Sequence, residues 1–416
     1  MVFLPIYEDS PLSKYLGAAG YSLVMPLSLV LIFLYAVFNK RLPKNKNLNR
    51  LFNLCLGMTI VSYIAIIVWV VLGGDMTVMS EFLPYKALKV ALQYFSYPAY
   101  IAIILICTRK TGTTYIGKYS FFTLIVLTII CIIEKQQSPY AFRSLHFAAA
   151  FPYWRIRLLT LESSWTAMMI YAYSALSLYW SFTYKKKICL LFSILSFTIL
   201  LYYSGSKTLM AAVAITILVY VIVSFRKSRK KALFTIFVAV VAFLIFTYTV
   251  FPMLKESING DIANFSSVST RLYTSAIGLM IGLVYPFGVG GAVSLSVYQN
   301  TLAKYLPMYR RLMPGFNLTE IESLITNHTD IALTVKSGIL NANMYWGIVG
   351  TIYLIYIFSK TISSIRKKNV IYSDMLTTIF WTAFILLFAV NMTFDFWLLY
   401  AFLLCLDEET NRYVQQ

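Results

Sequence analysis

The sequence predicts an all-α polytopic membrane protein with about 11 transmembrane helices, in a range of roughly 10 to 12. Of its 416 residues, 59% are hydrophobic and only 12% are charged, whereas soluble domains carry about 25% charged residues. Apolar runs close to the roughly 20 residues that cross a bilayer recur along the whole chain. They lie at about 21–38, 51–72, 88–107, 119–133, 164–183, 188–203, 208–225, 232–252, 341–359 and 373–391, with a shorter run at 395–406.

The linkers between these runs alternate in charge, and the alternation predicts an orientation. Basic segments follow the first, third, fifth, seventh and ninth runs, among them KRLPKNKNLNR at 40–50 and FRKSRKK at 225–231. Short loops rich in lysine and arginine stay in the cytoplasm. We therefore expect the N-terminus outside and the C-terminus inside. The net charge of +19 then reflects topology, and no nucleic acid is needed as a partner.

The same alternation places both long connections on the outer side. We divide the chain into N-terminal membrane helices (1–133), an outer loop with arginines (134–163), central membrane helices (164–252), a long outer loop with short amphipathic or re-entrant helices (253–340), and C-terminal membrane helices with a cytoplasmic tail (341–416). The sequence contains no GxxxxGK[ST], DxD or HExxH motif. We expect chemistry that uses neither cytosolic nucleotides nor a metal, and no cofactor.

Unusual charges gather at the outer membrane edge. The stretch YWRIRLLTLESSW at 153–165 carries Arg155, Arg157 and Glu162 just before a predicted helix, where charge is costly. If the stretch is helical, Arg155 and Glu162 share a face and either anchor the helix or serve a substrate. We expect both arginines at the outer interface, where their loss changes stability little. Lys207, in a tight SGSK turn, either reaches to the membrane surface or joins them.

A predicted helix in the long outer loop combines one arginine with small residues on one stripe. The stripe consists of Arg271, Ser275, Gly278 and Gly282. Counted from Arg271, these residues stand at offsets of 0, 4, 7 and 11, which match the helical period of 3.6 residues. The small residues either line a cavity or permit close helix packing, and the arginine favours the cavity. A PFGVGG turn ends the helix.

Two residues compete for the role of a general base. His328, in the long outer loop, has the side chain best suited to accept a proton near neutral pH. Its alternative role is that of an ordinary loop residue. Glu162 is the competitor, and it either takes the proton or orients an arginine.

Four segments, in this order, resemble the bacterial O-antigen polymerase/ligase superfamily of lipid-linked glycan transferases. They are RIRLLTLESS before a span, SGSKT opening a later span, STRLYTSAIGLMIGLVYPFGVGG, and NMYWGIVGTIYLIYIF at the end of the long outer loop. The resemblance covers roughly residues 143–360. Ligases of the superfamily usually carry a His-Asn pair before the glycine of the last segment. This chain has KSGILNANMYW there, which favours the polymerase (Wzy-like) branch.

The resemblance implies a GT-C-like glycosyltransferase of the bacterial cytoplasmic (inner) membrane that works on its outer, periplasmic face in polysaccharide or lipopolysaccharide biosynthesis. An acceptor hydroxyl would attack the anomeric carbon of an undecaprenyl-pyrophosphate-linked glycan, and lipid pyrophosphate would leave with inversion. Arg155, Arg157 and Arg271 would bind the pyrophosphate, assisted by Lys207, because guanidinium groups match phosphate oxygens. The expected partners are these lipid-linked glycans, membrane lipid and, optionally, a chain-length regulator.

Three other functions compete with polymerisation. One is O-antigen ligation, which uses the same kind of donor. The second is a lipid-linked oligosaccharide flippase or polysaccharide exporter, which would need charges on several helices along a central cavity. The predicted mid-span positions carry almost none. The third is a non-catalytic partner in envelope assembly, which leaves the arginines unexplained.

The orientation can be tested with an impermeant thiol reagent on intact cells. In a cysteine-free background we expect Ser296→Cys to react from outside and Ser373→Cys to be protected, because basic loops stay inside. Labelling of Ser373→Cys but not of Ser296→Cys would reverse the topology and remove the functional interpretation with it.

Overall fold

The computed structural model describes residues 1–16, 20–39, 43–147, 151–225, 240, 267–326, 333–368, 370 and 372–415. Most of these residues are helical. The helices are α1 (Ser13–Leu16), α2 (Val24–Asn39), α3 (Lys46–Val71), α4 (Leu83–Thr111), α5 (Thr114–Gln137), α6 (Thr166–Thr183), α7 (Lys187–Ser204), α8 (Lys207–Phe225), α11 (Ser267–Val284), α12 (Ser294–Leu312), α13 (Thr319–Thr326), α14 (Gly338–Lys367), α15 (Ser373–Leu386) and α16 (Phe394–Gln415). Two 3-10 turns, η1 (Leu4–Ile6) and η3 (Arg143–Leu145), and one antiparallel hairpin, β1 (Thr77–Val78) with β2 (Glu81–Phe82), complete them.

Several described helices have the length and composition of membrane spans. Among the described residues, α3, α4, α5, α7 and α14 are long and apolar enough to cross a bilayer, while α2, α15 and the part of α8 up to Ile222 are apolar but shorter. The prediction of an all-α membrane protein is confirmed at this level. Apart from residue 240, the predicted run at 232–252 lies outside the described residues.

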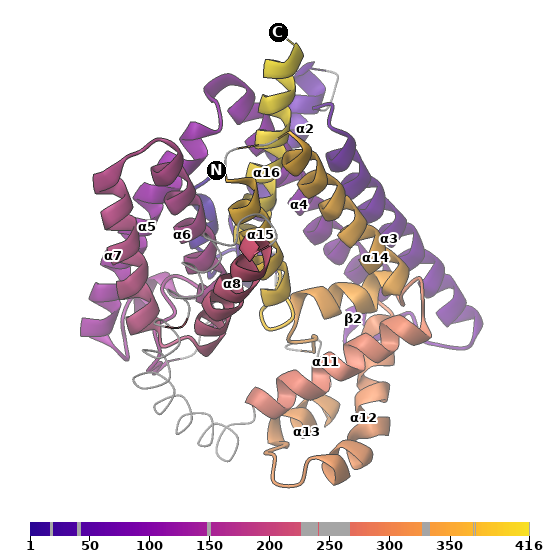
Figure 1. Cartoon of the computed structure of the whole chain (residues 1–416). Helices are drawn as coiled ribbons and strands as arrows, with labels where there is room; N and C mark the ends of the chain where they lie inside the picture. The colour runs from indigo at the N-terminus through magenta and orange to yellow at the C-terminus, as the bar shows by residue number, and fades with distance from the viewer. Residues whose placement is uncertain are drawn as a thin grey trace.

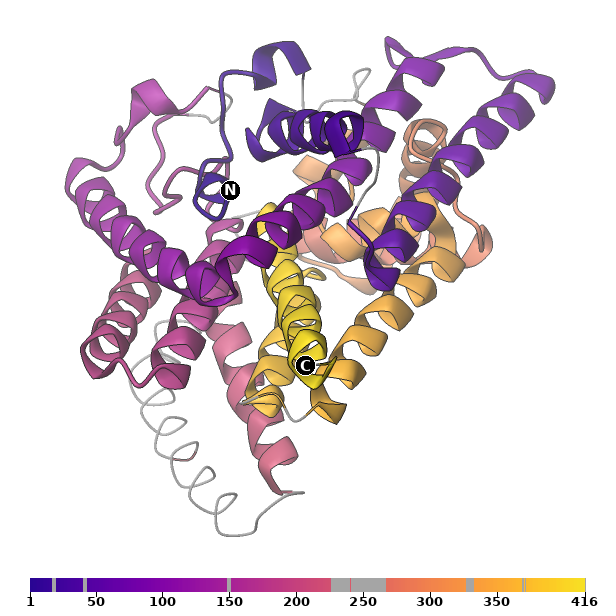
Figure 2. The ribbon, with the colours of Figure 1, turned by 90° about the horizontal axis from the view of Figure 1, so that it is seen from above.

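The helix α6 lies at the centre of one half of the bundle. Nearly all of its residues are buried, and it packs against α5, α7 and α16. A helix built from alanine, serine, methionine and aromatic residues on every side can be enclosed in this way. In the other half, α4 contacts α2, α3 and α16. Figure 2 shows α16 running between the two halves, so this last helix joins them.

The acidic end of α16 holds loops that the charge pattern places inside. Glu408 pairs with Arg109 at 2.9 Å and accepts a hydrogen bond from Asn45 at 2.9 Å. Asp407 pairs with Lys368. These contacts gather three predicted inner segments and the C-terminal end of α16 at one end of the molecule.

The helices of the long predicted outer loop group at the opposite end. Figure 1 shows α11, α12 and α13 together, away from the C-terminus. On α11, a Cβ added to Gly278 would lie 2.8 Å from the side chain of Val335. A Cβ added to Gly282 would lie 1.9 Å from the side-chain amide nitrogen of Asn343. The glycines therefore permit close packing against α14 and the segment before it. The expectation that this part of the stripe lines a cavity is wrong.

A break in α14 receives the turn that ends α11. Gly347 has φ +70°, outside the helical region, and a Cβ there would lie 2.0 Å from the carbonyl oxygen of Pro286. The amide of Val289 bonds to Met344 O at 3.1 Å, and that of Val349 bonds to Pro286 O at 3.1 Å. Two segments that carry the family resemblance thus pack directly on each other.

We expect Gly347→Ala to destabilise the protein by about 3 kcal/mol or more, because an added methyl overpacks the contact and strains a positive φ. Gly57→Ala is the control, since no atom outside its own helix lies within 4 Å of its added Cβ. That change should be neutral or stabilising by up to about 1 kcal/mol. Thermal unfolding of the two proteins in detergent compares them, and equal midpoints would contradict the packing described.

Candidate functional site

The stretch at 153–165 forms turns and bends, and α6 begins after it, at Thr166. The condition under which Arg155 and Glu162 would share a helical face, a helix over this stretch, is therefore not met. Arg155 is exposed. Its assignment to pyrophosphate stays a prediction.

Arg157 lies inside the protein and is only 1% exposed. Its guanidinium carbon lies 4.3 Å from the ring centre of Phe151 and 4.4 Å from that of Tyr153, distances at which a cation is attracted to an aromatic face. The carboxylate of Glu134 accepts hydrogen bonds from the amides of Arg157 and Leu158, at 3.0 and 2.8 Å. The expectation that loss of Arg157 changes stability little therefore conflicts with its enclosed position, and this burial argues against a role as a pyrophosphate ligand.

The first ten residues insert among the helices and support this loop. The amide of Glu8 bonds to Leu159 O at 3.0 Å, and Asp9 lies 2.9 Å from the imidazole of His146, with both side chains fully buried. Burial raises the pKa of Glu8, and the nearby Asp395 raises it further. The sequence shows these acids only as polar residues before the first apolar run, so their burial has no sequence signal.

Arg271 and Glu162 come together from two segments of the resemblance. Arg271 lies in the first turns of α11, and its guanidinium donates a hydrogen bond to the carbonyl oxygen of Ala389, in the loop between α15 and α16. Its other terminal nitrogen lies 4.0 Å from the Glu162 carboxylate. Both side chains are partly exposed, so an ion or substrate can reach them.

Lys336 belongs to the same region, and our sequence analysis assigned it no role. Its ammonium lies 3.6 Å from Glu320, which also accepts a hydrogen bond from Thr270 at 2.9 Å. Glu320 thus connects Lys336 to Thr270, the residue before Arg271 in α11. No sequence pattern singles out Lys336, which stands just before the N-cap of α14.

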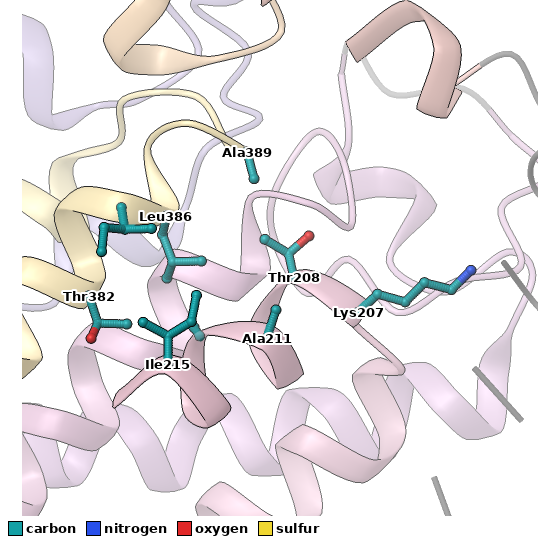
Figure 3. Close-up of a pocket in the computed structure, with 9 residues that line it drawn as sticks. Lys207, Thr208, Ala211, Ile215, Thr382, Leu386 and Ala389 are labelled. Atoms are coloured by element: carbon teal, nitrogen blue, oxygen red, sulfur yellow. The ribbon is translucent and has the colours of Figure 1, made fainter. Parts of the chain in front are cut away.

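Lys207 approaches the same interhelical loop from another direction. It is the first residue of α8 and lies at the mouth of a cavity of about 320 Å³ between α8 and α15. Ala389, whose carbonyl binds Arg271, also lines this cavity. Figure 3 shows the lysine side chain extending from one end of it.

Three cations from three elements thus adjoin the loop 387–390 in different ways. Arg271 donates to Ala389 O, Lys207 lines one cavity together with Ala389, and Lys336 directly precedes Ser337 and Gly338, which bond to carbonyl oxygens of the loop. Two carboxylates, Glu162 and Glu320, accompany them, so the five side chains carry a net positive charge. Such a set can bind a multiply charged anion through charge-assisted hydrogen bonds. In the described part of the chain, no group of three or more histidine, cysteine, aspartate or glutamate residues could hold a metal ion. His328 lies outside the described residues.

Comparisons with protein-family models, with curated proteins and with solved structures find no match to this chain.

Truncation should affect the stability of the protein strongly at Arg157 and hardly at all at Arg155. We expect Arg157→Ala to lower stability by about 2–4 kcal/mol, because it leaves a cavity between two aromatic rings, and to reduce the amount of protein in the membrane. Arg155→Ala should change stability by less than about 0.5 kcal/mol, as exposed substitutions do. Quantitative blots of membranes and melting curves in detergent measure both effects. Unchanged stability of Arg157→Ala would contradict the buried position.

Proposed function

We propose that this protein polymerises undecaprenyl-pyrophosphate-linked repeat units on the outer face of the bacterial cytoplasmic membrane. One observation carries the proposal: Arg271 binds the carbonyl oxygen of Ala389 in the loop between α15 and α16, and the same alanine lines an apolar cavity that has Lys207 at its mouth. Lys336, paired with Glu320, stands just before the segment that bonds to this loop. A lipid pyrophosphate combines the two properties that this site offers to a ligand, because its head is a multiple anion and its chain is apolar. The order of the four motif segments supports the same class.

The cations would bind the pyrophosphate and assist its departure. A guanidinium can hold two phosphate oxygens at once, so Arg271 suits the bridging role, while each lysine adds a single charge. Negative charge grows on the leaving oxygen in the transition state, and fixed cations stabilise that charge more than they stabilise the bound donor. Each lost contact should cost about 1.5–3 kcal/mol, which corresponds to tenfold or more in rate.

In the proposed reaction an acceptor hydroxyl oxygen forms a bond to the anomeric carbon of the donor sugar. The bond from that carbon to the pyrophosphate oxygen breaks, and lipid pyrophosphate takes the electron pair, so the configuration inverts. The hydroxyl proton passes to a base. Within the described residues, Glu162 is the candidate for this base, since its carboxylate lies 4.0 Å from Arg271 and is partly exposed. His328 stays the competing proposal.

The remaining parts of the proposal concern the setting of the site. We propose about 11 spans in a GT-C-like arrangement, with α11, α12 and α13 on the outer side and the basic loops inside. Membrane lipid surrounds the helices, and a chain-length regulator is an additional partner. The reaction needs no metal, since the cations of the chain supply the positive charge.

Deletion of the gene tests the function directly. We expect the ladder of long glycans on gels to collapse to a single capping repeat. Complementation with Arg271→Ala or Lys336→Ala should shorten the ladder strongly, with tenfold or greater loss of turnover, while Arg271→Lys restores part of it. The matched control is Arg310→Ala, which removes an exposed arginine whose partner is Glu322, outside the cation set. Its ladder should be normal.

Other ladders would support other functions. Accumulation of lipid-linked repeats on the cytoplasmic side would favour a flippase. Long chains that remain lipid-linked and never reach the surface acceptor would favour a ligase. Normal ladders from both Arg271→Ala and Lys336→Ala, at normal protein amounts, would remove these residues from the site.

A further inference from the structure

The cavity beside Lys207 is formed by matched faces of two helices. From α8 it is lined by Thr208, Ala211, Ala212 and Ile215, and from α15 and the loop after it by Thr382, Ile385, Leu386 and Ala389. Each set follows the spacing i, i+3, i+4, i+7, which is one face of a helix over two turns. At a rise of 1.5 Å per residue, the groove is about 10 Å long. The alanines leave the space, because larger side chains at those positions would fill it.

The polarity of the groove is graded from end to end. Among the described residues that line it, Lys207 is the only charged one, and it stands at one end. Figure 3 shows Ile215, Thr382 and Leu386 at the other end. The backbone amides of the first turn of α8 add partial positive charge at the lysine end. A ligand that fits this gradient has an anionic head and a slender apolar chain.

The charge pattern of the loops places the lysine end at the outer surface and the apolar end toward the middle of the bilayer. A lipid of the outer leaflet has the same polarity, with its head at the surface and its chain pointing inward. Ala211 and Ile385 are both exposed, so the groove is accessible along its length and not only from its charged end.

We infer that this groove between α8 and α15 binds the first part of the prenyl chain of the lipid pyrophosphate, with Lys207 against the phosphate nearest to that chain. This inference rests on the proposed function for the identity of the lipid. It adds that the protein recognises its donor by the hydrocarbon as well as by the pyrophosphate. The small side chain of Ala211, on the exposed wall, then leaves the groove wide enough for the prenyl chain.

The test compares ligands that share a head and differ in chain length. Purified protein in detergent is titrated with undecaprenyl pyrophosphate, farnesyl pyrophosphate and inorganic pyrophosphate, and binding is followed by the shift in melting temperature. We expect undecaprenyl pyrophosphate to bind at least tenfold more tightly than inorganic pyrophosphate. Ala211→Trp, which fills the groove, should remove most of that advantage. The control is Ala214→Trp, an exposed alanine one turn further along α8 that does not line the groove, and it should retain the advantage.

The outcomes separate this inference from the proposed function. If Ala211→Trp keeps the full chain-length dependence, the groove does not hold the chain, whatever the ladder assay shows. Ala211→Trp could lose the chain-length dependence while the deletion strain still makes normal glycans. That result would support the prenyl site and contradict the proposed polymerisation.

Discussion

A helix can stop inside a bilayer only where its free backbone groups find partners within the protein. The helix α15 has 14 residues, which is about 21 Å and short of the roughly 30 Å of hydrocarbon. In the loop that follows, the carbonyl oxygens of Leu387, Ala389 and Val390 accept hydrogen bonds from other segments. Leu387 O accepts from Ser337, and Val390 O accepts from the amide of Gly338 at 2.8 Å. Ala389 O accepts from Arg271.

This constraint explains why the cations lie where they do. Arg271 donates to a loop carbonyl and still keeps one terminal nitrogen directed toward Glu162. The segment that begins α14 is held by the same loop, so Lys336 is placed beside it. The groove next to Lys207 ends at the same alanine. The loop between α15 and α16 therefore lies next to the three charged residues and the apolar cavity that the proposed reaction requires.

The membrane helices and the meeting of the motif segments could be predicted from the sequence, because hydropathy and basic loops are local signals. The outer placement of Arg271 and Glu162 was predicted, but their pairing was not. The sequence joined Glu162 to Arg155 only if the stretch at 153–165 were helical, and that stretch forms turns and bends. The burial of Arg157 could not be predicted, since side-chain direction in an irregular loop has no period. The small-residue stripe with Gly278 and Gly282 was compatible with a cavity lining or with close helix packing. Only the position of α14 in the structure distinguishes the two.

The buried beginning of the chain has a consequence for how the protein is made. The carbonyl oxygens of Met1 and Val2 accept hydrogen bonds from Tyr100 and Tyr173, on α4 and α6, and Glu8 lies beside the start of α16. The segment 1–8 can therefore reach its final place only after α16 has been made, because Glu8 lies beside the start of that helix.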